Sequence, residues 1–186
     1  MGQKAERTKE HIRREAGRLF AAKGFQAVTM ADICRQTGLS RGGLYRYYAN
    51  TGQIFSEILW EEPSVADRIQ RRERADDILA DLLSILRQEI LDKDSSLSLA
   101  VYEYANLGNQ DLFARRRRQA KERWISLIQY GMETGRFRPV DPDRVSDLIL
   151  YYYQGLRLWS QALPLDDKTA GYYVQTIQSI LLKEEG

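Results

Sequence analysis

The residues with the clearest potential for binding chemistry lie between positions 40 and 47, where small, basic and aromatic side chains share one short segment. The run Ser40-Arg41-Gly42-Gly43-Leu44-Tyr45-Arg46-Tyr47 combines guanidinium groups, which contact base edges and phosphates, with hydroxyl groups that bond phosphate oxygens. Each of the two glycines lowers helix propensity by about 1 kcal/mol. That cost is easier to understand if another molecule must approach the backbone. These residue types therefore indicate contact with a nucleic-acid groove.

Two helix starts and one tight turn would position this segment. Thr29 is a favourable N-cap, and Asp32 places negative charge in the first turn of a helix whose inward apolar residue is Ile33. Gly38 can end that helix in a left-handed conformation, and Ser40 is a second N-cap. Two short helices joined by such a turn predict a helix-turn-helix.

The sequence around these helices is more specific than the pattern alone, which also fits a helical hairpin with solvated Arg and Tyr side chains. Three phrases stand out: A-x-x-L-F-x-x-x-G-F at 16–25, T-M-A-D-I at 29–33, and G-L-S-R-G-G-L-Y-R-Y-Y at 38–48. Through these phrases the segment from Arg13 to Phe55 resembles the TetR family of transcriptional regulators. The resemblance implies an all-α protein with an N-terminal three-helix helix-turn-helix DNA-binding domain (1–50) and a C-terminal helical ligand-binding and dimerisation domain (51–186).

The motif suggests a role for each residue that would face DNA. We expect base readout from Arg41, Gly43 and Tyr45, with Arg46 as a further candidate, and phosphate contacts from hydroxyl groups and from amides at helix N-termini. The predicted DNA-contacting residues are Thr29, Met30, Ser40, Arg41, Gly42, Gly43, Tyr45, Arg46, Tyr47 and Thr51.

The helix expected after position 50 departs from the family pattern in two ways. Its start often carries a lysine that contacts phosphate, whereas this chain has Thr51 followed by Gly52. A hydroxyl and nearby backbone N–H groups can still meet a phosphate, but one cationic contact is missing. Pro63 disfavours helix at Glu62, so this helix is expected to end or kink near residues 60–62.

Composition describes a globular chain with a basic head. Of the 186 residues, 43% are hydrophobic and 29% are charged, which allows a substantial core. Residues 1–50 hold ten bases and four acids, a net charge of +6, whereas the remaining 136 residues hold 18 bases and 22 acids, a net charge of −4. This asymmetry coincides with the motif and favours a phosphate-binding N-terminal domain.

Several classes of site are disfavoured by what the sequence contains. A single cysteine, Cys34, excludes an intrachain disulfide and leaves no set of thiols for a metal cluster, so we expect no metal and no cofactor. The first ten residues lack the apolar segment of a signal peptide. The apolar run from Leu148 to Tyr153 is far too short to span a membrane. We therefore expect a cytoplasmic protein without a membrane partner.

The rest of the chain shows helical periodicity, with further helices expected over 76–91, 97–107, 110–134, 142–162 and after Asp166 or Asp167. The helix over 142–162 is apolar on more than one face, so more than one surface must bury it. In the family that the motif resembles, the last two helices pair with their copies in a second subunit, which implies a homodimer. The predicted interface residues are Leu150, Tyr151, Tyr153, Leu158, Tyr173, Ile177, Ile180 and Leu181.

The predicted C-terminal domain also carries many aromatic residues on helices that line an effector pocket in the family. Any one of them is readily explained by core packing, but as a group they suggest a mainly apolar cavity suited to a small lipophilic or aromatic effector. No basic cluster accompanies them, which disfavours a phosphorylated ligand, while Arg157 alone keeps a carboxylate possible. The predicted ligand-binding residues are Trp60, Tyr102, Tyr104, Trp124, Tyr152, Arg157 and Trp159.

Three classes of function remain to be compared. The leading one is a repressor that binds a near-palindromic DNA operator as a homodimer and is released by a small effector, since one short recognition helix contacts too few base pairs alone. A helical ligand-binding or adaptor module without specific DNA binding is the alternative, and Thr51 is consistent with it. An α-helical enzyme is disfavoured, because the sole histidine, His11, lies on a basic helix without any nucleophile or metal-ligand spacing.

Overall fold

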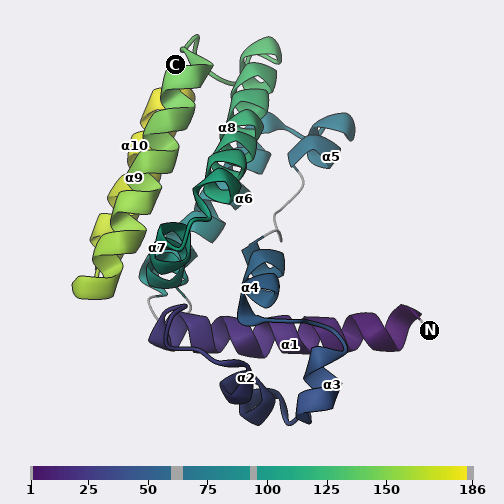
Figure 1. Ribbon diagram of the computed structural model, residues 1–186. Coiled ribbons are helices and arrows are strands. Elements are labelled where there is room, and N and C mark those ends of the chain that lie inside the picture. The colour runs from purple at the N-terminus through teal and green to yellow at the C-terminus, as the bar shows by residue number, and fades with distance from the viewer. Residues whose placement is uncertain (1, 60–64, 93–95, 184–186) are drawn as a thin grey trace. The chain divides into compact units, whose positions relative to one another are not determined.

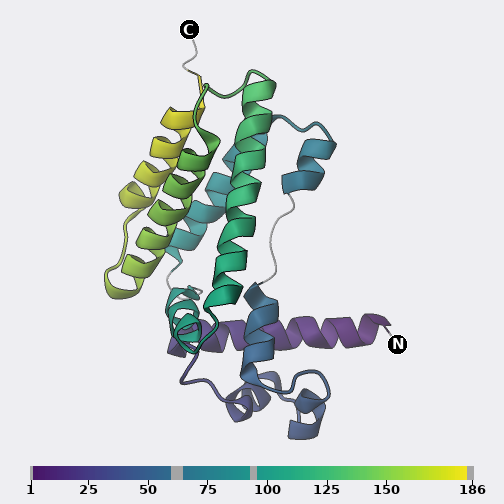
Figure 2. The same cartoon turned by 45° about the horizontal axis from the view of Figure 1, so that its top comes forward.

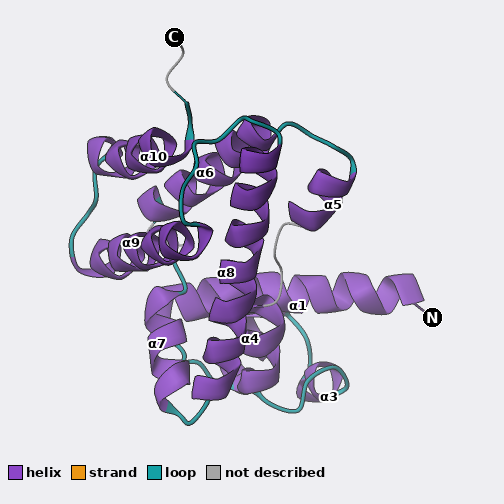
Figure 3. Cartoon of the chain, turned by 90° about the horizontal axis from the view of Figure 1, so that it is seen from above, coloured by secondary structure: helices purple, strands orange, loops and turns teal. Residues whose placement is uncertain are grey.

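The computed structural model describes residues 2–59, 65–92 and 96–183, and every regular element within these ranges is a helix (Figures 1 and 3). The predicted all-α class is therefore confirmed. The chain divides into two compact units, the first made of residues 1–62 and 94–109 and the second of residues 63–93 and 110–186. None of the helices in the described ranges combines the length and apolar character needed to cross a membrane.

The first unit contains the two helices of the helix-turn-helix and three further helices. In Figures 1 and 2, α4 crosses α1, and α2 and α3 lie together on one side of α1. The predicted order of the N-terminal helices is confirmed, and α3 has only five residues. The helices of this unit are α1 (Gly2–Lys23), α2 (Met30–Thr37), α3 (Arg41–Tyr45), α4 (Thr51–Leu59) and α7 (Ser98–Asn106).

A cluster of aromatic rings explains why α4 and α7 belong to the first unit. The Phe25 ring lies 5.2 Å from that of Phe55 on α4 and 4.5 Å from that of Tyr104 on α7, measured between centroids. Phe20 of α1 completes the cluster at 4.9 Å from Phe55. Because these rings pack together, the boundary expected after residue 50 does not coincide with the division between the units.

The second unit is a bundle in which α6, α8, α9 and α10 run alongside one another, with the short α5 against α8 (Figures 1 and 2). Its core contains the apolar stripes that the sequence predicted, including Ile78, Leu83, Leu127 and Ile149. The helix α5 was not predicted. The helices are α5 (Val65–Gln70), α6 (Ala75–Leu91), α8 (Gln110–Glu133), α9 (Pro142–Ala162) and α10 (Asp167–Leu181).

A single aromatic side chain in a loop closes one end of this bundle. Phe137, between α8 and α9, is only 1% exposed and forms an isolated β-bridge with Leu182. A Cβ atom added to Gly131 of α8 would lie 2.1 Å from the Phe137 ring, so only glycine leaves room for that ring. The loop is thus anchored by a side chain that the sequence analysis had not assigned to the core.

Candidate DNA-binding surface

The start of α2 is held by a reciprocal capping box. The Thr29 hydroxyl accepts the backbone N–H of Asp32 at 3.2 Å, and the Asp32 carboxylate accepts the Thr29 N–H at 2.9 Å. The Thr29 hydroxyl also donates to the same carboxylate at 2.6 Å. These bonds from Thr29 lower the pKa of Asp32 to about 2. Since the Thr29 proton is already engaged, a phosphate at this helix start would be met by backbone N–H groups rather than by that hydroxyl.

The helix α3 buries one residue and exposes the others. The Ser40 hydroxyl caps it by accepting the Gly43 N–H at 3.1 Å, as the sequence predicted. Leu44 is 0% exposed and holds α3 against the first unit. Outside that contact, Arg41, Gly42, Tyr45 and Arg46 are exposed. The predicted recognition segment therefore presents cationic and hydroxyl groups to solvent around a gap left by glycine.

The two glycines of α3 have different surroundings. A Cβ atom on Gly42 would meet nothing within 4 Å, whereas one on Gly43 would lie 3.2 Å from the Ser40 hydroxyl oxygen. A side chain at position 43 would therefore press on the N-cap of its own helix. Gly42 is the position where added bulk would affect only an approaching molecule.

The residues directly after α3 continue the positive surface. The Arg46 guanidinium lies 5.5 Å from the centroid of the Tyr47 ring. Interactions with the Arg46 and Thr8 side chains, with further effect from the Lys4 charge, hold the pKa of the Tyr47 hydroxyl below its usual range. A hydroxyl in such a cationic setting is suited to a phosphate oxygen. Lys4 and Thr8 were not predicted to lie at this site.

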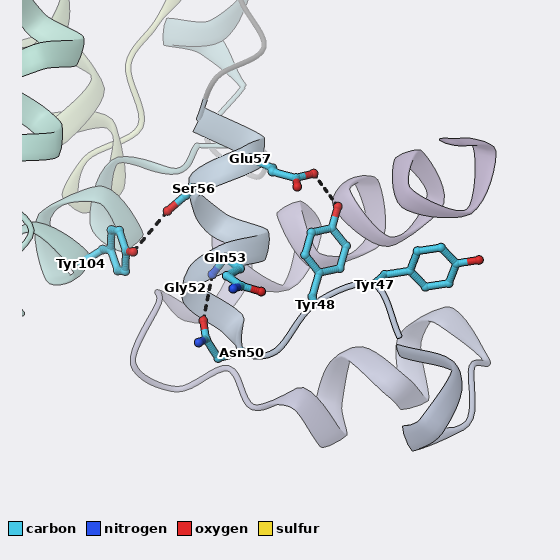
Figure 4. Close-up of a pocket in the computed structure, with 8 residues that line it drawn as sticks. All are labelled: Tyr47, Tyr48, Asn50, Gly52, Gln53, Ser56, Glu57 and Tyr104. Atoms are coloured by element: carbon cyan, nitrogen blue, oxygen red, sulfur yellow. Dashed lines mark hydrogen bonds between the residues drawn. The ribbon is translucent and has the colours of Figure 1, made fainter. Parts of the chain in front are cut away.

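A side-chain cap related to a capping box, which was not predicted from the sequence, forms the start of α4 (Figure 4). The Asn50 side-chain oxygen accepts the Gln53 N–H at 2.9 Å, and the Gln53 side-chain oxygen accepts the Ala49 N–H at 2.8 Å. The spacing N-x-x-Q is the sequence signal that could have revealed it. The cap places Thr51 and Gly52 in the first turn, where intrahelical acceptors for their N–H groups are lacking. An open pocket of about 480 Å³ adjoins this turn and is lined by Tyr47, Tyr48, Asn50, Gly52, Gln53, Ser56, Glu57 and Tyr104.

Polar contacts from α1 hold the end of α2. Glu15, buried on α1, accepts a hydrogen bond from the Gln36 side-chain amide at 3.1 Å and an ion pair from Arg18 at 2.9 Å. His11 lies 3.2 Å from the Thr37 carbonyl oxygen through its Nε2 atom. The exposed face of α3 therefore rests on a helix pair whose geometry is fixed by more than apolar burial.

The predicted ligand-binding residues do not form one cluster. Tyr104 lies in the first unit, where its hydroxyl is 3.2 Å from that of Ser56 and its ring is part of the aromatic cluster. Tyr102, also on α7, is exposed. In the second unit, Trp124 is buried and Tyr152 stacks edge-on against Tyr173 at 5.1 Å. Trp159 is exposed on α9, and Trp60 lies outside the described residues.

Arg157 is buried, and its guanidinium is hydrogen-bonded to carbonyl oxygens at the end of α6. Its guanidinium donates to the Glu89 carbonyl oxygen and, at 3.4 Å, to the Asp92 carbonyl oxygen. The neighbouring Tyr153 hydroxyl donates to the Glu89 carboxylate, and burial together with that carboxylate raises the pKa of Tyr153. Arg157 therefore satisfies helix carbonyls, which weakens the argument for a ligand carboxylate at this position.

The predicted interface residues need a correction. Tyr173, Ile177 and Leu181 are 0% exposed in the core of their own unit, so they have no surface left to bury against a second copy. Leu150, Tyr153 and Ile180 are half-buried, while Tyr151 and Leu158 are exposed. The sequence pattern did not separate the inner side of these two helices from the outer side, and the interface itself stays a prediction. The large apolar residues exposed on α9 and α10 are Leu148, Tyr151, Leu158, Trp159 and Tyr172.

Comparison with known proteins places this geometry in a family. Residues 12–58 match the model for bacterial regulatory proteins of the tetR family. The chain is 28% identical over 153 residues to the uncharacterised HTH-type transcriptional regulator YfiR of Bacillus subtilis, covering 73% of this chain and 74% of the relative. It is 26% identical over 139 residues to the HTH-type transcriptional repressor KstR2 of Mycobacterium tuberculosis, covering 70% of each.

A solved structure agrees over the whole fold. The TetR-family regulator from Cytophaga hutchinsonii superposes with a TM-score of 0.72 at 18% identity, covering 99% of this chain and 100% of that one. At this identity the agreement concerns the fold. With the helix-turn-helix, its caps and its exposed basic helix in place, and with these relatives, the chain belongs to the TetR family of transcriptional regulators.

Proposed function

We propose that this protein is a repressor that binds a near-palindromic DNA operator as a homodimer and is released when a small, mainly apolar effector binds. The observation that carries the proposal is the arrangement of α3. Its one buried residue, Leu44, fixes the helix, while Arg41, Gly42 and Tyr45 face solvent. A helix exposed in this way can enter the major groove with its N-terminal residues toward the base edges. The name of the M. tuberculosis relative supports repression as the direction of control.

Homodimer formation is supported by the outer face of α9. Leu148, Tyr151, Leu158 and Trp159 are all exposed there, at spacings that follow one side of a helix. Monomeric proteins rarely leave a contiguous apolar surface of this kind uncovered. A second copy related by two-fold symmetry would cover it and would present two recognition helices to two half-sites.

An effector site is proposed within the second unit. Trp124 and Tyr152 supply aromatic surface there, and the buried Arg157 is already engaged with helix carbonyls. A ligand of mainly apolar character fits such surroundings better than a phosphorylated one. The proposed site does not include Tyr104, which belongs to the first unit, or Trp159, which is exposed.

The direct test is selection of bound fragments from the genome of the source organism with purified protein. We expect enrichment of a short inverted repeat. Arg41→Ala should weaken binding to that duplex by about 1–3 kcal/mol per half-site if Arg41 reads a base. If Arg41 touches only phosphate, affinity for selected and shuffled duplexes should fall together. A protein that retains no duplex at low salt would instead be the helical binding module without DNA binding.

Release by an effector is tested with a closed thermodynamic cycle. Compounds that raise the melting temperature would be measured for their effect on affinity for the selected duplex. A coupling free energy of about 1–3 kcal/mol corresponds to roughly 5–150-fold weaker DNA binding, and DNA must weaken ligand binding by the same factor. A compound that binds without changing DNA affinity would contradict the proposed switch.

A further inference from the structure

One carboxylate of the first unit receives three donors from two other parts of the chain. Glu57 lies on α4, two turns after its start. Its side chain accepts the Tyr48 hydroxyl at 2.7 Å, the Lys9 ammonium at 3.1 Å and the Arg13 guanidinium at 3.3 Å. Lys9 and Arg13 belong to α1, and Tyr48 follows α3 (Figure 4 shows the contact with Tyr48). Glu57 therefore joins α1, α4 and the segment leaving the recognition helix at one point.

Tyr48 is well suited to transmit this contact to α3. Its backbone N–H donates to the Leu44 carbonyl oxygen at 3.1 Å, which fixes it to the last turn of the recognition helix. The side chain is only 2% exposed, and the Lys9 ammonium lies 5.3 Å from the centroid of its ring. A shift of the Tyr48 backbone would therefore disturb the last turn of α3.

The cluster is poorly explained as a device for stability alone. The side chains of Glu57 and Lys9 are 39% and 33% exposed, and an ion pair with this much solvent contributes little to the free energy of unfolding. Arg13 is less exposed, at 16%, but it also pairs with the partly solvated Glu57 carboxylate. Burial opposes ionisation of Glu57, yet the Tyr48 and Lys9 hydrogen bonds keep the pKa of its carboxyl below the usual range. Glu57 is thus an anion that accepts these bonds at neutral pH.

We propose that Glu57 is a positioning residue for DNA recognition, which sets the orientation of α3 through Tyr48 and withholds Lys9 and Arg13 from the phosphate backbone. The inference rests on the proposed DNA-binding function and concerns a residue outside the predicted contact surface. Base readout needs α3 at a fixed angle, whereas attraction to phosphates needs only positive charge. Loss of Glu57 should therefore lower specific binding and leave nonspecific binding equal or stronger.

The experiment compares a duplex selected by the parent protein with a shuffled duplex of the same length. For Glu57→Ala we expect about tenfold or more loss on the selected duplex, the order of effect of one hydrogen bond to a charged group. Affinity for the shuffled duplex should stay equal or rise. Tyr48→Phe should lose specific binding in the same direction. The variant that combines Glu57→Ala and Tyr48→Phe should bind the selected duplex as well as Glu57→Ala alone, because both changes break the same contact.

A matched control removes the same charge elsewhere. Glu10→Gln changes an exposed residue of α1. The ratio of its affinity for the selected duplex to its affinity for the shuffled duplex should therefore equal that of the parent protein. Glu57→Gln keeps the shape of the side chain and an acceptor for Tyr48, and its ratio should lie between those of the parent and Glu57→Ala. Melting curves of each variant would verify that the chain is folded at the assay temperature.

The outcomes separate this inference from the proposed function. If the parent prefers the selected duplex and both Glu57→Ala and Tyr48→Phe keep that preference, the positioning role is wrong. Equal loss on both duplexes in the folded variants would also overturn it, because orientation would then not be the quantity affected. A parent protein that selects no duplex would overturn the proposed function itself, and the inference with it.

Discussion

At the scale of single residues, the clearest consequence concerns Gly42. A side chain there meets no protein atom within 4 Å, so its effect on DNA binding can be separated from its effect on folding. Gly42→Ala should raise the free energy of unfolding by up to about 1 kcal/mol through helix propensity. Gly42→Leu should abolish binding to the selected duplex by excluding α3 from the groove. Urea titrations and gel shifts of both variants check this.

A graded result would be the most informative. If DNA affinity falls from glycine to alanine to leucine while the urea midpoint stays constant or rises, close approach of the backbone is the cause. Normal operator binding by a folded Gly42→Leu variant would contradict it. Gly43 is a poorer test position, because a side chain there crowds the Ser40 cap.

Asp32 gives a prediction about pH. The bonds from Thr29 lower its pKa from 3.8 to about 2 in the folded chain. A lowered folded-state pKa means that the carboxylate stabilises the fold above pH 4, and that this contribution is lost as the pH falls toward 2. Asp32→Asn should therefore unfold at lower urea than the parent at pH 6. The difference between the two midpoints should shrink at pH 2.5.

Comparing the parent with Asp32→Asn isolates the effect of the Asp32 carboxyl, since every other carboxyl titrates in both proteins. A difference between the midpoints that stays constant from pH 6 to pH 2.5 would show that the carboxylate charge is not what the cap requires. Thr29 was identified from the sequence as an N-cap and Asp32 as an acid of the first turn, whereas the reciprocal capping box between them was not predicted.

At the scale of helices, the elements that could be predicted from sequence are those marked by residues at their own ends. The bounds of α9 were predicted correctly, because Asp141 and Pro142 mark its start and Pro164 follows its end. The six-residue α5 was missed, since a segment this short shows no clear periodicity. The exposed face of α3 could be predicted from its own few residues, whereas the contacts of Glu57 could not. Its partners lie 9, 44 and 48 positions away.

The contact between Gly131 and Phe137 gives a prediction at this scale. A methyl group on Gly131 would overlap the Phe137 ring, and the ring cannot shift without leaving the core at the end of the bundle. Gly131→Ala should lower the free energy of unfolding by about 1–3 kcal/mol despite its better helix propensity. Chemical denaturation measures the change. Gly155→Ala, on α9 with open space around the added Cβ atom, is the control and should not destabilise the chain.

At the scale of the whole molecule, the outer face of α9 predicts the state of assembly. Light scattering should give about 43 kDa, twice the chain mass of 21.6 kDa. Leu158→Glu should shift the protein to the monomer, because a charge would have to be buried at the centre of an apolar interface. Ile85→Glu, on a similarly exposed residue of α6, should leave the mass unchanged. A parent protein that stays monomeric at micromolar concentration would contradict the dimer.

The predicted ligand-binding residues show what cannot be predicted from sequence at this scale. Aromatic residues were grouped by helix, but Tyr104 packs with Phe25 and Phe55 while Trp124 and Tyr152 belong to the other unit. Nothing local in the sequence distinguishes an aromatic side chain that fills a core from one that lines a cavity. The inner and outer sides of α10 were confused for the same reason, because burial depends on which helices lie next to it.

The division of labour within α3 has a consequence for engineering. Only Leu44 anchors the helix from within, and the Ser40 cap and Tyr48 hold it from outside its five residues. The side chains of Arg41, Tyr45 and Arg46 take no part in that anchoring, so they can be exchanged without disturbing the position of the helix. A library randomised at these three positions, with Gly42 kept, should yield folded variants that select new duplexes and respond unchanged to the proposed effector.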